Sequence, residues 1–226
     1  MRFVGLILFC WCVLAAPGHA GAWLRDTGTG FLALSGTYRD TVPDPTFETS
    51  LYAEYGAAPR LTLGLDIIER SGTTGHALVF ARLPIGSADG HNRLALELAV
   101  GGYHWQGKWS QMYKATLSYG RGFESRFGNG WLAVDAAIER SPSLPDTYYK
   151  LDTTIGLSSG GKIRPLLQIE TSYAPGFPVN WAITPGIMID AKQKPGKPRK
   201  TWIVGIERKY AGQHSLGLKL GLWTSF

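Results

Sequence analysis

The chain has 226 residues, a length that suits one substantial domain, and its 23 lysines and arginines outnumber its 17 acidic residues to give a net charge of +6. Its two cysteines, Cys10 and Cys12, both lie in the first apolar stretch. The rest of the chain has no thiol, which excludes a disulfide framework, a cysteine nucleophile and a cysteine metal site.

Residues 1–20 are predicted to be a cleavable secretory signal peptide. A single cation, Arg2, precedes an apolar run over residues 3–16, and small residues stand just before an expected cleavage point after Ala20. A membrane anchor is the alternative, but the run is shorter than the ~20 residues of a spanning helix. We therefore expect one exported domain over residues 21–226. Export without cysteine fits the cell envelope of a Gram-negative bacterium.

The exported domain is predicted to consist of β-strands. After residue 20 no apolar run approaches the ~18 residues that indicate a spanning helix, and no helical period recurs. Apolar residues instead alternate with small or polar ones, and Gly, Pro, Asp, Asn or Ser interrupt the alternation repeatedly. Twelve strands are predicted, at 29–38, 47–56, 60–69, 75–84, 93–104, 110–121, 130–140, 147–157, 162–173, 179–190, 200–209 and 214–226.

The predicted strands have one apolar face and one face of small, polar or charged residues. In the fifth strand, Leu94 and Leu96 lie on one face, whereas Ala95 and Glu97 lie on the other. A slip of one residue would move charged side chains into the apolar layer, so the register is well specified.

The last predicted strand has the clearest pattern. The leucines at even positions over 216–222 fall on one face, whereas Gly217 and Lys219 fall on the other. A soluble sandwich or a lipocalin-like barrel would bury the leucines in its core, whereas a transmembrane barrel turns them towards lipid. Small residues alternating with single charges suit a narrow lumen lined by salt bridges. We therefore interpret the domain as an antiparallel up-and-down transmembrane β-barrel of about twelve strands.

Aromatic residues gather at the ends of the predicted strands. Tyr103, Trp105 and Trp109 flank one hairpin tip, and Trp223 and Phe226 lie at the end of the last strand. Ordinary enrichment in strands explains any single ring. Clustering at strand ends is instead typical of the aromatic girdles of membrane barrels.

With its signal peptide, its meander of strands and a last strand ending Leu222-Trp223-Thr224-Ser225-Phe226, the chain resembles bacterial outer-membrane β-barrels. The resemblance implies that Leu222, Trp223 and Phe226 belong to the signal read by the barrel-assembly machinery. It also implies contact with outer-membrane lipids. The segments 60–66 and 80–83 are similar to segments of transporter-like barrels grouped with the phenol-degradation meta-pathway proteins. No catalytic or ligand motif comes with either resemblance.

Charged residues on the polar strand faces are predicted to line the lumen. An even number of strands places both termini in the periplasm. The short external loops show no large lid or plug. The charged lumen supports two interpretations, a structural salt-bridge network and a polar path for small solutes. The predicted lumen residues are Asp66, Arg82, Glu97, Lys114, Asp135, Glu139, Lys150, Asp152, Arg164, Glu170 and Lys219.

The sequence predicts a narrow channel or transporter for small solutes, with no cofactor and no metal. A lipid-modifying hydrolase in the same fold is one alternative, and it needs a serine and a histidine within hydrogen-bond reach. His76, His91 and His104 are scattered, and His214 and Ser215 are neighbours on a strand, so their side chains point to opposite faces. A closed structural or adhesin-like barrel is the other alternative.

A basic turn over 192–200 contains Lys192, Lys194, Lys197, Arg199 and Lys200. It fits a solvated loop or contact with an anionic neighbour such as a lipid head group. Nucleic acid is not an expected partner, because the chain is exported and has no recognisable nucleic-acid fold.

Overall fold

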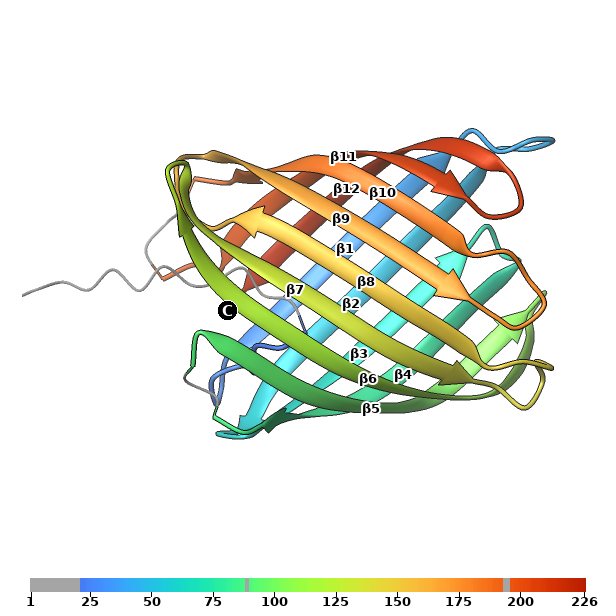
Figure 1. Ribbon diagram of the computed structural model, residues 1–226, viewed down its shortest axis with the longest axis horizontal. Coiled ribbons are helices and arrows are strands. Elements are labelled where there is room, and N and C mark those ends of the chain that lie inside the picture. Colours follow the sequence, from blue (N-terminus) through green and yellow to red (C-terminus); the bar gives the residue numbers. More distant parts are fainter. Residues whose placement is uncertain (1–20, 88–89, 193–195) are drawn as a thin grey trace, which may run out of the picture.

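A computed structural model describes residues 21–87, 90–192 and 196–226 and shows one closed β-barrel (Figure 1). Twelve antiparallel strands follow one another in chain order, and β1 pairs with β12 to close the barrel. The predicted all-β architecture and number of strands are confirmed. The strands are β1 (Gly30–Arg39), β2 (Thr46–Ala58), β3 (Leu61–Arg70), β4 (Thr74–Ile85), β5 (Asn92–Trp105), β6 (Lys108–Ser125), β7 (Gly128–Arg140), β8 (Tyr148–Leu157), β9 (Ile163–Tyr173), β10 (Asn180–Asp190), β11 (Arg199–Tyr210) and β12 (His214–Ser225).

The largest difference from the predicted bounds lies in β6. This strand continues to Ser125, four residues beyond its predicted end, whereas every other bound agrees within two residues. The Gly-rich sequence after residue 121 reads as a turn, but its backbone pairs with the start of β7 down to Ser125 opposite Gly128. The predicted signal peptide, 1–20, lies outside the described residues.

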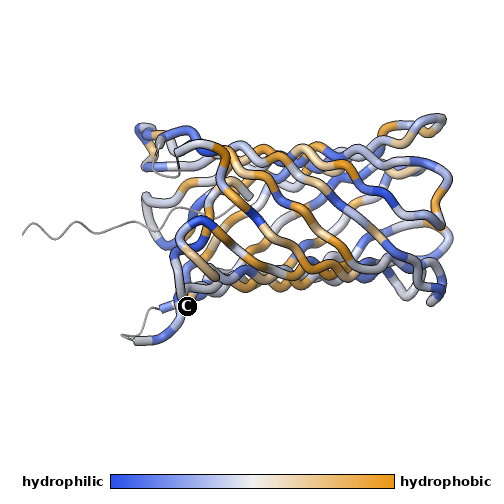
Figure 2. Tube along the Cα trace, turned by 90° about the horizontal axis from the view of Figure 1, so that it is seen from below, coloured by the Kyte–Doolittle hydropathy of each residue, from blue (hydrophilic) through white to orange (hydrophobic). Residues whose placement is uncertain are grey.

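The two faces of each strand are set by the alternation in the sequence. In β5, Leu98 is 59% exposed on the outside of the barrel, whereas Ala95 is 0% exposed on the inside. Figure 2 shows hydrophobic residues concentrated along the middle of the barrel and hydrophilic residues gathered at both ends. This outward apolar band is the surface that a membrane barrel presents to lipid. Within the described parts of the chain, no helix is long and apolar enough to cross a membrane.

The barrel has two distinct ends. The hairpin end holds the tips of the six hairpins formed by successive strand pairs, β1–β2 to β11–β12 (Figure 1). The terminal end holds the start of β1 and the end of β12. There the seam is completed by two backbone hydrogen bonds: Gly30 donates to Phe226 at 2.7 Å, and Phe226 donates to Gly30 at 3.0 Å.

The first described residues, 21–29, form an N-terminal segment. Its residues 21–25 reach into the barrel, whereas residues 26–29 are exposed. Trp23 is buried at 4% exposure, and Arg25 donates from its backbone nitrogen to Thr62, an inward residue of β3, at 2.9 Å. Thr27 makes an isolated bridge with Gly56. The prediction of no large lid or plug concerned the external loops, whereas this occupant of the lumen comes from the N-terminal stretch.

Two of the predicted girdle aromatics point into the barrel. Trp223 packs beside Phe31, with ring centroids 6.0 Å apart, and Tyr103 packs on an inward cluster containing Phe80. Strand parity explains both, because Trp223 shares the face of Lys219 and Tyr103 shares that of Glu97. Trp109 and Phe226 are exposed and have the parity of the outer face, whereas Trp105 is exposed at the hairpin tip, where β5 ends.

Candidate functional site: the polar lumen

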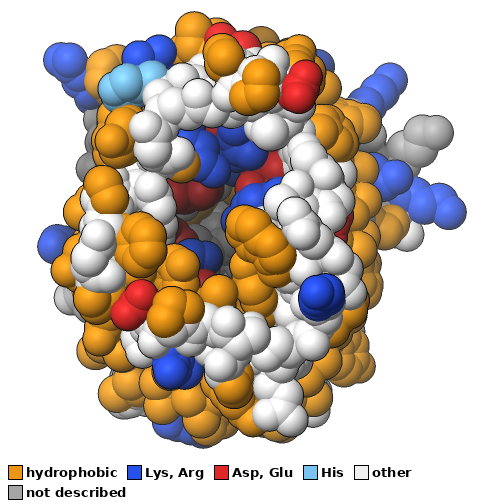
Figure 3. Space-filling view, turned by 90° about the vertical axis from the view of Figure 1, so that its right-hand side faces the viewer, with side chains coloured by type: hydrophobic (Ala, Val, Ile, Leu, Met, Phe, Trp, Pro, Cys, Tyr) orange, Lys and Arg blue, Asp and Glu red, His pale blue; other side chains and the backbone are white. Residues whose placement is uncertain are grey.

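The lumen holds a polar cavity. It comprises two spaces of about 280 Å³ each, one towards the terminal end and one towards the hairpin end. Seen from the hairpin end, the barrel has a hollow mouth with Lys, Arg, Asp and Glu side chains inside it (Figure 3). The two spaces adjoin each other in the lumen and are together called the cavity, and they share the lining residues Ser35, Ser50, Lys114, Lys150, Asp152 and Lys219.

Arg82 lies at the centre of a buried ion-pair cluster on the terminal side of the cavity. Its guanidinium pairs with Glu54 and, at 2.5 Å, with Glu97, its register partner on β5. Tyr52 donates its hydroxyl proton to Glu54 at 2.6 Å, and Arg82 donates to Tyr52 at 2.6 Å. Arg25 of the N-terminal segment reaches the same Glu54 at 2.5 Å. The cluster therefore ties the wall of the barrel to the segment inside it.

A second set of ion pairs crosses the middle of the lumen. Lys114 of β6 lies 2.9 Å from Asp66 of β3, and the His76 ring lies 3.3 Å from the same carboxylate. Lys150 of β8 pairs with Glu139 of β7 at 3.0 Å. Lys114 and Asp66 are 48 residues apart in the chain and three strands apart round the barrel, so the pairing and curvature of β3 to β6 bring them together.

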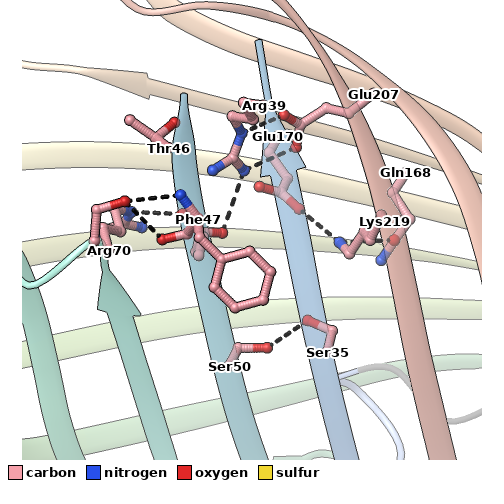
Figure 4. Close-up of polar contacts among 12 residues, drawn as sticks. Ser35, Arg39, Thr46, Phe47, Ser50, Arg70, Gln168, Glu170, Glu207 and Lys219 are labelled. Carbon is pink, nitrogen blue, oxygen red and sulfur yellow. Dashed lines mark hydrogen bonds and ion pairs between the residues drawn. The ribbon is translucent and has the colours of Figure 1, made fainter. Parts of the chain in front are cut away.

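A third set lies near the hairpin end (Figure 4). Arg39 donates to the two carboxylate oxygens of Glu207 at 2.5 and 3.0 Å. The Glu48 carboxylate forms ion pairs with two arginines, Arg39 at 3.4 Å and Arg70 at 2.6 Å. It therefore links the Arg39–Glu207 pair to Arg70. The two-pronged contact of Arg39 fixes both side chains, because a guanidinium matches the geometry of a carboxylate.

Lys219 of β12 makes a looser contact beside this set (Figure 4). Its ammonium lies 3.6 Å from Glu170 and donates to Gln168 at 3.0 Å. Glu170 is about half exposed, so this pair is hydrated and open to a solute.

Two predicted lumen carboxylates have no ion pair with a cation among the described residues. Asp135 of β7 and Asp152 of β8 are register partners, and Asp152 is in turn the register partner of Glu170. Three acidic side chains therefore lie side by side on the inner face of β7, β8 and β9. Oδ1 of Asp135 is buried and has no hydrogen-bond partner within the described parts of the chain.

All eleven predicted lumen residues lie on inward faces, but two are not on the cavity. Glu139 pairs with Lys150 and does not line it. Arg164 lies near the terminal end, where it pairs with Asp190 at 2.6 Å and donates to the backbone oxygen of Ser158 at 2.7 Å. The other nine line the cavity: Asp66, Arg82, Glu97, Lys114, Asp135, Lys150, Asp152, Glu170 and Lys219.

An apolar cluster forms the floor of the cavity towards the terminal end. Trp23 of the N-terminal segment lies among inward side chains of the wall and is 4% exposed. The sequence predicts a lumen of small and polar residues, so this cluster differs from expectation. Its members are Ala22, Trp23, Trp131, Ala133, Leu166, Met188 and Ile203, with Trp223 packed against them.

The basic turn is divided by the structure. Lys192 and Lys197 are exposed in the connection from β10 to β11, and Lys194 lies outside the described residues. Arg199 and Lys200 are instead the first residues of β11, and Arg199 pairs with Asp190 at 3.0 Å. The interpretation of all five cations as one turn was therefore wrong, because two of them belong to a strand.

Several inward charges escaped the sequence analysis. Arg39 is the last residue of β1 and precedes a Pro-rich loop, so it reads as part of that loop. Arg25 lies outside every strand, and alternation gives no signal for it. Glu48 and Lys209 lie near strand ends, and each is an even number of residues from inward neighbours on its strand. This spacing was a signal in the sequence from which their inward position could have been predicted.

The histidines contact carboxylates and aromatic rings. His104 bonds to Glu69 at 2.7 Å, and its ring lies 4.8 Å from that of Trp109 at an angle of 46°. The His214 ring lies 5.0 Å from that of Tyr210. Among the described residues, no group of three or more His, Asp or Glu side chains could hold a metal ion.

Comparison with known proteins shows a shared fold. No protein-family model and no curated protein sequence matches the chain. Among solved structures, it is similar to the KdgM porin (TM-score 0.59, 11% identity, 87% of this chain and 99% of that chain). It is also similar to an outer-membrane channel from Pseudomonas putida F1 (TM-score 0.52, 13% identity, 92% and 99%) and to the β domain of the Bordetella autotransporter BrkA (TM-score 0.51, 15% identity, 89% and 100%).

The chain therefore has the fold of an outer-membrane β-barrel protein, as the sequence predicts. Within this class it is a twelve-stranded barrel with a charged lumen and an N-terminal segment inside it.

Proposed function

We propose that the protein is an outer-membrane channel for small polar solutes, with outer-membrane lipids around its apolar band. The observation that supports this proposal most strongly is the charged cavity that opens at the hairpin end. Two of the structures with a similar fold are a porin and an outer-membrane channel, which agrees with it. The function is passage of a solute without covalent chemistry.

The lumen charges are nearly balanced, so we expect weak selectivity between anions and cations. Seven carboxylates and six cations line the cavity. Most cations already pair with a carboxylate, so the charge of one sign is limited to the acidic row of Asp135, Asp152 and Glu170. The carboxylates are Glu48, Glu54, Asp66, Glu97, Asp135, Asp152 and Glu170, and the cations are Arg70, Arg82, Lys114, Lys150, Lys209 and Lys219.

The N-terminal segment is proposed to control the width of the channel. It contributes Trp23 to the apolar floor and Arg25 to the Arg82 cluster, and both side chains are buried. Deleting residues 21–25 would remove this occupant while leaving all twelve strands in place.

Single-channel recording in planar bilayers tests the proposal. Protein isolated from outer membranes should give discrete, reproducible steps, and the variant lacking 21–25 should give larger ones. Gel migration that shifts on heating shows that both proteins are folded. Silence from both folded proteins would contradict a channel and would favour the closed structural barrel.

The lipid-modifying hydrolase is the second candidate. His76 and His104 contact carboxylates and His214 contacts an aromatic ring. A hydrolase would also need a serine hydroxyl within hydrogen-bond reach of one of these rings. Phospholipid hydrolysis by the folded protein, abolished by substitution of one histidine, would overturn the choice.

A further inference from the structure

The start of the described chain lies against a buried carboxylate in the lumen. A Cβ added to Gly21 would overlap Oδ1 of Asp135 and would lie 2.6 Å from Oγ of Ser118. The nitrogen of Gly21 is bonded to the same Cα at about 1.46 Å, so it lies in this polar corner too. Ser118 and Asp135 are register partners on β6 and β7, so neighbouring strands hold them together.

The corner contains two carboxylates, those of Asp135 and Asp152, that have no ion pair with a cation among the described residues. Oδ1 of Asp135 is buried without a hydrogen-bond partner within the described parts of the chain, and Asp152 is the register partner of Asp135. Nearby cations have carboxylate partners elsewhere: Arg82 with Glu54 and Glu97, Lys114 with Asp66, and Lys150 with Glu139. Removing a carboxylate from water is costly unless it is paired or hydrogen-bonded.

We propose that Asp135, Ser118 and Asp152 form a binding site for a primary ammonium, and that its resident ligand is the α-ammonium of Gly21. This proposal rests on the predicted cleavage after Ala20, and it does not depend on whether the barrel conducts. Cleavage converts the peptide nitrogen of Gly21 into a cation with three donors. The cation pairs with Asp135, donates to Ser118 and offsets the charge of Asp152.

The site gives signal-peptide removal a structural consequence. Only the cleaved chain has a charged nitrogen at Gly21, so only that chain gains the ion pair. The pair holds the start of the N-terminal segment against β6 and β7, while Arg25 holds its other part against Glu54. Together the two contacts fix Trp23 in the apolar floor between them.

Amine labelling of the exported protein tests the site. The full chain is expressed with its signal peptide, isolated from outer membranes and weighed by mass spectrometry, which should show that it begins at Gly21. Acylation of the Gly21 amine is then followed by peptide mass spectrometry, with exposed Lys108 as the standard in the same sample. The folded protein should react about tenfold more slowly at Gly21 than the unfolded protein, which corresponds to ~1.4 kcal/mol.

A matched pair of variants separates the ion pair from simple burial. Asp135→Asn should raise the labelling rate of Gly21 towards the unfolded value. Asp44→Asn, in the exposed β1–β2 loop, should leave it unchanged. In the unsubstituted protein a carbodiimide should join the Gly21 amine to the Asp135 carboxyl as an amide, a result that needs no variant to fold.

Three outcomes would overturn the proposal. The first is that the exported chain begins at a residue other than Gly21. The second is that Gly21 is labelled as slowly in folded Asp135→Asn as in the unsubstituted protein. The third is that no Gly21–Asp135 amide forms although other neighbouring amine–carboxyl pairs react. None of these measurements requires an ion current. A protein that gives no channel current in bilayers would therefore contradict the channel but not this binding site.

Discussion

At the scale of single residues, the lumen is held by charges that have partners on several strands. Arg82 is 2% exposed and pairs with both Glu54 and Glu97, and Arg25 also pairs with Glu54. A buried ion pair adds little net stability compared with apolar packing. Removing one partner is nevertheless strongly destabilising, because the other charge is left buried without a partner. The arrangement therefore makes each buried cation more important to the fold than its pairwise attraction suggests.

Arg82→Ala should destabilise the barrel strongly. The change leaves two buried carboxylates without their shared cation, so we expect the free energy of unfolding to fall by about 3 kcal/mol. Urea unfolding in detergent, followed by heat-shifted gel migration, measures the effect. Arg121→Ala, at an exposed position, is the control and should change little. Equal losses in the two variants would show that Arg82 has no special role.

At the scale of elements, the N-terminal segment packs closely against β2 at Gly56. Gly28 donates its backbone N–H to the oxygen of Gly56 at 2.9 Å, and Gly56 donates to Thr29 at 3.0 Å. A side chain at Gly56 would meet the backbone oxygens of Asp26 and Arg25. The backbones can approach this closely only where Cβ is absent.

Gly56→Ala should displace the N-terminal segment from the wall. Because the added methyl group meets backbone atoms, we expect a loss of about 1–3 kcal/mol and faster protease cleavage within residues 21–29. Gly122→Ala is the matched control, since the nearest atom to its added methyl group is 4.0 Å away. Unchanged protection of the segment in Gly56→Ala would contradict this close approach.

The C-terminal strand β12 combines a structural role with a predicted assembly role. Trp223 supports the apolar floor, whereas Phe226 is 62% exposed and bonds to Gly30 through its backbone. Recognition of Leu222, Trp223 and Phe226 by the barrel-assembly machinery stays a prediction.

Deleting Phe226 separates recognition from stability. Loss of its two backbone hydrogen bonds should lower the free energy of unfolding by at most about 2–3 kcal/mol. The variant should therefore still refold in detergent. If the machinery reads Phe226, the yield of folded barrel in cells should fall much further than the refolding yield. A parallel loss in both measurements would assign Phe226 a role in stability alone.

At the scale of the whole molecule, the orientation of the barrel wall decides where the protein can reside. Outward leucines cover the middle of the barrel and inward charges fill its lumen, the reverse of a soluble β-barrel with an apolar core. Leu98, near the centre of β5, represents the lipid-facing band.

Leu98→Arg should destabilise the barrel in lipid vesicles by about 2–4 kcal/mol, because a cation at the bilayer midplane is desolvated. Val42→Arg, in the exposed β1–β2 loop, should cost less than about 1 kcal/mol. Unfolding by denaturant in vesicles measures both free energies. Similar small effects at both sites would contradict a membrane-spanning band.

The sequence by itself determined the strands, their faces and the inward position of the charges. These properties follow from a period of two, which is local and visible wherever apolar and polar residues alternate, as at Leu94 to Glu97. The charged inner wall follows from the same alternation.

Only the tertiary structure decided which charges meet and what occupies the lumen. Lys114 reaches Asp66 across a wall curved over four strands, and Arg39 reaches Glu207 over Gly217 of β12 only after β1 pairs with β12. The N-terminal segment has no alternation, so no local signal predicted that Trp23 and Arg25 would turn inside. Their placement depends on the shape and charge of a cavity that twelve strands create together.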